Sequence, residues 1–116
     1  MKLDPVLHDG KWCFCAAGQD ALIPVEAIAM FRESEGTTFI LSAQDAEKLG
    51  LSAIFYARWI EISADTSLDE TGITAAISAK LADAGISCNV WAANNHDHIF
   101  VPFPLGRKAW ELLKEL

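Results

Sequence analysis

The order of secondary-structure signals in the second half of the chain restricts its fold more than any other feature. The run from Phe55 to Ser63 (FYARWIEIS) alternates in polarity and predicts a strand. From Thr71 to Ala84 apolar residues recur every four positions, which predicts an amphipathic helix that stops at Gly85. Because strand and helix signals follow one another directly, this half indicates a mixed α and β architecture.

Two more strands and a helix follow. Ile86 to Ala92 predicts a strand, residues 93–96 a turn, and Asp97 to Val101 a strand that returns antiparallel. A last amphipathic helix begins after Pro104 and carries its leucines on one stripe. The order strand, helix, strand, strand, helix is most of a ferredoxin-like βαββαβ unit that lacks its final strand.

The first half contains fewer elements. The opening up to Gly10 indicates a loop with a turn, and Lys11 to Ala17 predicts a strand with apolar residues on both faces. Ser42 is a candidate N-cap for a short helix from Ala43 to Leu49.

Between these lies a hairpin signal, formed by Ala27 to Arg32 and Thr37 to Leu41. Val25 to Arg32 also permits a helix, but the second β-run beside it favours the hairpin. The first half is too small to close a core alone. We therefore predict an α+β fold of two interleaved units with antiparallel sheets, divided at 1–57 and 58–116, in which an early strand completes the second unit.

Composition excludes several classes of function. Hydrophobic residues make up 52% of the 116 residues, which argues against disorder. The net charge is −7, and neither half offers the basic face that nucleic acid requires. The chain has no apolar run of transmembrane length and no apolar leader at its start, so we expect a cytoplasmic protein without a membrane partner. Its three cysteines then indicate reduced thiols.

A family resemblance rests on three stretches. The first is Thr71-Gly72-Ile73-Thr74, and the second is the sequence LADAGIS from Leu81 to Ser87. The third combines Asn89-Val90 with the sequence HDHIFVP from His96 to Pro102. Together they resemble the ACT domain, and in particular short bacterial proteins with two ACT-like units, similar to the ACT repeats of aspartate kinases and arginine sensors. Two departures are Thr71, where many ACT domains have proline, and Asp69-Glu70, where the ligand loop often has one aspartate directly upstream.

The resemblance implies a regulatory module that binds an amino acid, without catalysis or cofactor. The exposed N–H groups at the helix start suit a carboxylate, and the carboxylate of Asp97 suits an ammonium group. The expected ligand-binding residues are Asp65, Thr66, Ser67, Gly72, Ile73, Thr74, Asn89 and Asp97. The apolar content, including four tryptophans, together with the resemblance predicts a homodimer. The alternative is a structural interaction or dimerisation module that binds no ligand.

Other reactive residues favour structural roles. His96 and His98 share a strand face, but a metal needs three or four ligands, and His8 is remote in sequence, so we expect no bound metal. Cys13 and Cys15 lie one residue apart, which indicates core packing rather than a redox pair. No nucleophile, base and oxyanion set is apparent, so we expect no enzymatic activity.

Overall fold

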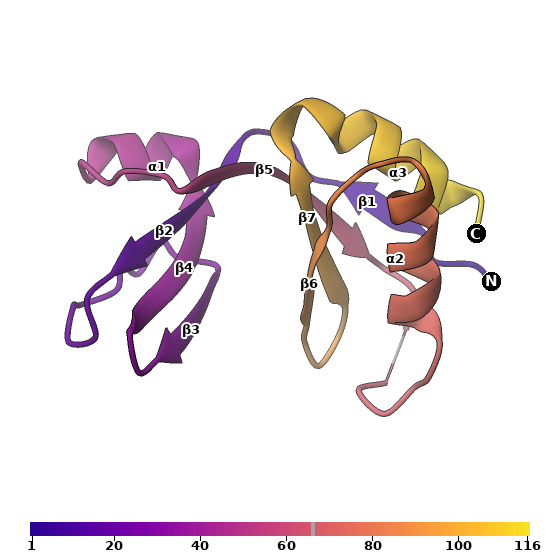
Figure 1. Ribbon diagram of the computed structural model, residues 1–116, viewed down its shortest axis with the longest axis horizontal. Helices are drawn as coiled ribbons and strands as arrows, with labels where there is room; N and C mark the ends of the chain where they lie inside the picture. The colour runs from indigo at the N-terminus through magenta and orange to yellow at the C-terminus, as the bar shows by residue number, and fades with distance from the viewer. Residues whose placement is uncertain (66) are drawn as a thin grey trace. The chain divides into compact units, whose positions relative to one another are not determined.

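The computed structural model describes residues 1–65 and 67–116, which form two compact units. The larger unit joins Met1–Asp9 to Arg58–Leu116, and the smaller unit is Gly10–Ala57 (Figure 1). The first nine residues thus belong with the larger unit.

The larger unit has a sheet in the order β1, β5, β7, β6 and two α-helices. Its elements are β1 (Pro5–Leu7), β5 (Phe55–Ile62), α2 (Ile73–Asp83), β6 (Asn89–Ala92), β7 (Asp97–Pro102), the 3-10 turn η1 (Phe103–Leu105) and α3 (Gly106–Lys114). From β5 onward this is the predicted strand, helix, strand, strand, helix order of a ferredoxin-like unit.

The strand that completes this unit is β1. It pairs antiparallel with β5, with Pro5 opposite Ile62 and Leu7 opposite Ile60. The prediction that the two units interleave through an early strand is therefore confirmed. The prediction of a loop for the opening segment is wrong, because a three-residue strand is stabilised by long-range pairing that leaves little local pattern.

The smaller unit is a second, reduced version of the same arrangement. It contains β2 (Trp12–Ala17), β3 (Ala29–Glu33), β4 (Gly36–Ser42) and α1 (Ala43–Lys48), and its sheet runs β3, β4, β2 and then the first residues of β5. Residues 18–28 form a non-helical segment where a ferredoxin-like unit has its first helix. Strand β5 thus takes part in both units.

Local signals account for the ends of several elements. The Ser42 hydroxyl accepts a hydrogen bond from the Asp45 N–H at 3.0 Å, so it caps α1 as the sequence predicts. Gly36 closes the β3–β4 hairpin at φ 153°, where a Cβ would lie 2.6 Å from the Ala17 carbonyl oxygen. Only glycine fits that position without a shift of the neighbouring strand.

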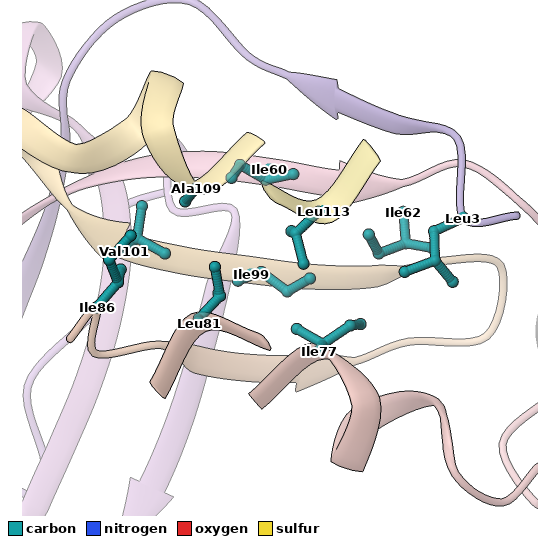
Figure 2. Close-up of a cluster of buried hydrophobic side chains, with 10 residues drawn as sticks. All are labelled: Leu3, Ile60, Ile62, Ile77, Leu81, Ile86, Ile99, Val101, Ala109 and Leu113. Carbon is teal, nitrogen blue, oxygen red and sulfur yellow. The ribbon is translucent and has the colours of Figure 1, made fainter. Parts of the chain in front are cut away.

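The core of the larger unit lies between its sheet and the two helices. Figure 2 shows Ile77 and Leu81 of α2 and Leu113 of α3 directed toward the isoleucines of β5 and β7. Ile77 and Leu81 are about one helical turn apart, and these helical residues and their strand partners are fully buried. Burial of one such side chain contributes about 1.5–3 kcal/mol, so this layer dominates the stability of the unit. The whole set is Leu3, Ile60, Ile62, Ile77, Leu81, Ile86, Ile99, Val101, Ala109 and Leu113.

The smaller unit has its own, smaller core. Cys13 and Cys15 of β2 pack with Phe39 and Leu41 of β4 and with Ala46 of α1. Burial raises the pKa of both thiols, so they remain protonated and behave as apolar side chains. Core packing is the role that the sequence predicts for this cysteine pair.

Candidate functional site

The loop after β5 and the turn between β6 and β7 border an open depression of about 660 Å³ in the larger unit. Its lining residues are Asp65, Ser67, Leu68, Glu70, Asn94 and Asn95. In a ferredoxin-like unit the end of the first strand and the hairpin turn lie at the same end of the sheet, which brings these two connections together. The volume falls within the range of small-molecule sites.

The depression is polar and carries negative charge. Asp65 and Glu70 supply two carboxylates, and Asn94 and Asn95 supply carboxamides that both donate and accept hydrogen bonds. The Ser67 hydroxyl donates to the Asp69 carboxylate at 2.7 Å, which holds the loop in a local turn. This combination provides acceptors for a cation beside donors for an anion.

Helix α2 begins at Ile73, three residues after Glu70. Gly72 is its N-cap at φ 91°, and glycine has no side chain with which to cap the first N–H groups. A Cβ at this position would meet nothing within 4 Å, so the left-handed backbone rather than crowding favours glycine. Uncapped N–H groups at a helix start attract an anion.

A smaller hollow of about 300 Å³ adjoins the same loop. It is lined by Met1, Lys2, Leu3, Ala64, Asp65, Glu70, Thr71 and Ile73. Asp65 and Glu70 border both hollows, so the loop carboxylates lie between the β6–β7 turn and the start of α2.

The structure distributes the predicted ligand-binding residues over this region unevenly. Asp65 and Ser67 line the depression, and Gly72, Ile73 and Thr74 form the start of α2. Thr66 lies outside the described residues. Two further predicted residues belong to the β6–β7 hairpin and are considered next.

Asp97 and Asn89 lie at opposite ends of that hairpin. Asp97 is opposite Ala92, next to the turn, whereas Asn89 is opposite Phe100 at the far end of the pairing. Asp97 is partly buried and makes an interaction of its own. The depression is lined instead by Glu70 and the turn residues Asn94 and Asn95, which are not among the expected ligand-binding residues.

A polar cluster occupies the sheet face opposite α2 and α3. Because Ile60 and Ile62 point to the helices, Trp59 and Glu61 must point to the other face. His8 stacks on the Trp59 indole with ring centroids 3.6 Å apart, and its Nε2 lies 3.1 Å from Glu61 Oε1. His96 Nε2 lies 3.7 Å from Glu61 Oε2. His8 and His96 are remote in sequence but both lie near the Glu61 carboxylate, because β1 brings His8 beside β5.

His98 belongs to the same face and has a defined proton position. The Trp59 indole N–H donates to His98 Nδ1 at 3.0 Å, so this nitrogen carries no proton in the neutral ring. Burial lowers the pKa of His98, with the charge of Glu61 acting in the opposite direction. Among the described residues no group of three or more His, Cys, Asp or Glu side chains is placed to hold a metal ion.

Comparison with known proteins agrees with the ACT resemblance. Two models of the ACT domain match the chain in tandem, one over residues 1–58 and the other over 55–115. A crystal structure of a Vibrio cholerae protein of unknown function, described as a possible transport protein, is 38% identical, with a TM-score of 0.89 over 98% of this chain and 88% of that one. No functionally curated protein matches the chain.

More distant structures share the fold alone. A protein from Agobacterium tumefaciens is 18% identical, with a TM-score of 0.77 over 99% of this chain and 89% of that one. The aspartokinase alpha and beta subunits are 11% identical, with a TM-score of 0.68 over 96% and 95% of the two chains. None of the helices in the described part of the chain is long and apolar enough to cross a membrane.

These matches, together with the two ferredoxin-like units, show that the chain belongs to the ACT-domain family. Domains of this family are typically regulatory modules that bind small ligands rather than catalysts.

Proposed function

We propose that this chain is a regulatory module, without catalytic activity, that binds a free amino acid at the depression between the β5–α2 loop and the β6–β7 turn. The observation that carries this proposal is the mixed lining of the depression. Two carboxylates, Asp65 and Glu70, stand beside two carboxamides, Asn94 and Asn95. An α-amino acid needs acceptors for its ammonium group and donors for its carboxylate at one small site.

The roles of individual residues follow from charge. The ammonium group pairs with Asp65 or Glu70, which are both exposed. The ligand carboxylate accepts hydrogen bonds from the asparagine amides and from the N–H groups at the start of α2, near Gly72, Ile73 and Thr74. A charge-assisted hydrogen bond contributes about 1.5–3 kcal/mol, so one at each end of the ligand gives about 3–6 kcal/mol, which corresponds to dissociation constants from several millimolar down to tens of micromolar.

A thermal-shift screen against the proteinogenic amino acids tests the proposal. A ligand at 100 times its dissociation constant stabilises the fold by about 2.7 kcal/mol, which raises the melting temperature by on the order of ten degrees. Asp65→Asn should reduce that shift strongly. Asp83→Asn is the matched control, because Asp83 is an exposed carboxylate at the other end of α2. Asp97→Asn tests whether the β7 carboxylate contributes.

If an amino acid raises the melting temperature of Asp65→Asn and Asp83→Asn equally, its binding does not involve Asp65. The absence of a shift with every amino acid at millimolar concentration would refute ligand binding of this kind. We further propose that the protein is cytoplasmic and that it forms a homodimer, which light scattering at high micromolar concentration tests by the molar mass.

A second candidate function is supported by the smaller unit. Its segment 18–28 exposes Leu22 and Val25 almost completely, at 97% and 96%, and β3 exposes Phe31 at 64%. The three residues belong to consecutive segments of the chain, and exposed apolar patches are typical of protein contacts. An interaction module would remain bound to its partner, or remain a dimer, in the absence of any amino acid. The double variant Leu22→Ser, Val25→Ser would abolish that association.

A further inference from the structure

A second hollow of the larger unit gathers positive charge in a chain whose net charge is −7. It measures about 390 Å³ and is lined by Pro5, Val6, Leu7, Asp9, Arg58, Arg107 and Trp110. The sequence contains three arginines, and two of them border this one hollow. Asp9 is the only acidic residue among the lining residues, and it makes an interaction of its own.

Arg58 is fixed in the wall of this hollow. Its Nη2 donates to the His8 carbonyl oxygen at 3.2 Å, and its side-chain stem lies against the first residue of α3, Gly106. A Cβ at Gly106 would stand 2.6 Å from the Cβ of Arg58, although the backbone of Gly106 is ordinary helix. A larger residue at position 106 would therefore overlap the Arg58 side chain. Glycine avoids this overlap, although it has a low helix propensity.

Neither Arg58 nor Arg107 forms an ion pair with any residue that the structure describes. Arg58 is half-buried, and a half-buried guanidinium group is normally paired, because removing a charge from water is costly. Arg107 is exposed and lies 5.8 Å from the centre of the Trp110 ring, whose N–H donates to the Pro5 carbonyl oxygen.

The surroundings add to this positive field. Arg107 is the second residue of α3, at the end where the helix dipole is positive. Trp110, Val6 and Leu7 supply an apolar wall beside the charges. Guanidinium groups bind carboxylate and phosphate oxygens through paired hydrogen bonds, so the hollow suits an oxyanion attached to a small apolar group.

From this geometry we infer a second ligand site in the larger unit, in which Arg58 and Arg107 bind the carboxylate or phosphate group of a small organic anion. The site is separate from the proposed amino-acid site. Arg58 is the first residue of β5 that belongs to the larger unit and Arg107 follows the end of β7, whereas the acidic loop follows the end of β5 and the β6–β7 turn precedes β7. The two hollows share no lining residue, so binding at one can be lost while binding at the other remains.

Titration of the isotope-labelled full chain with inorganic phosphate, and separately with acetate, tests this inference by NMR at constant ionic strength. Saturable shifts are expected at the Arg107 amide and the Trp110 indole N–H. Saturation by only one of the two anions supports the site and identifies which oxyanion it takes.

Arg107→Gln should weaken binding about tenfold, as expected for the loss of one charge-assisted pair. Lys108→Gln is the matched control, because it removes the same charge from the next residue of α3, outside the lining. This control should change the affinity by less than about twofold. The inference is overturned if neither anion gives saturable shifts, or if the two variants weaken binding equally, which would indicate general attraction to a basic helix.

Discussion

Replacement of Leu3 by alanine tests the interleaved arrangement through stability. Leu3 is only 3% exposed and belongs to the core of the larger unit, beside Ile62 in Figure 2. The backbone around it is tied to the segment after β5, since the Ala64 N–H donates to the Leu3 carbonyl oxygen at 3.2 Å. Leu3 is therefore part of the core of a unit whose other segment begins at Arg58.

Truncation of a buried leucine to alanine costs about 2–5 kcal/mol. Because Leu3 is near a terminus that can partly close over the space, we expect the lower half of that range, about 2–3 kcal/mol. For a chain of this length the melting temperature should fall by roughly 8–15 °C. Urea unfolding with an unchanged slope measures the free energy, and amide exchange should quicken in β5 and α2.

Ile54→Ala is the control, because Ile54 is an exposed aliphatic residue at 65%. It should change the free energy of unfolding by no more than about 0.5 kcal/mol. If Leu3→Ala behaves like this control, the N-terminal segment does not complete the larger unit, and the interleaving argument fails.

Three further predictions follow from single contacts. Gly106→Ala should destabilise the protein by about 1–3 kcal/mol through overlap with the Arg58 stem, whereas Gly18→Ala, which has open space around it, should change stability by less than about 0.5 kcal/mol in thermal unfolding. Burial holds the pKa of His98 below 6.5, so the unfolded chain takes up its proton first, and stability should fall as pH drops below 6.5 and level off once the folded ring protonates. His98→Gln should flatten that part of the profile. Native Cys13 and Cys15 should react slowly with a thiol reagent at pH 8, because burial raises the pKa of both thiols, and quickly once urea unfolds the chain.

Local patterns predict most elements of this fold. The Ser42 cap, the apolar spacing of α2 and the β6–β7 hairpin are each encoded within a few neighbouring residues. Strand β1 is different, because Pro5–Leu7 is stabilised by pairing with residues more than fifty positions away. The predicted strand from Ile86 begins only at Asn89, since Ile86 turns into the core at the end of α2.

The candidate site was less accessible to sequence reasoning. The loop of Asp65 and Ser67 could be selected from its place before a helix whose N-cap is Gly72. The turn residues Asn94 and Asn95 could not, because only the strand order brings them to that loop. The same reason applies to His8, which reaches Glu61 through the pairing of β1 with β5. In a ferredoxin-like unit the loop after the first strand and the hairpin turn lie at the same end of the sheet, and this rule would have predicted the two asparagines.

Amide chemical-shift mapping with each amino acid tests the central claim most directly, because it reports both binding and place. The account predicts saturable shifts for at least one amino acid, concentrated in residues 65–74 and 93–97, with β2 to β4 unaffected. Shifts confined to residues 10–57, or none at millimolar concentration with any amino acid, would contradict it.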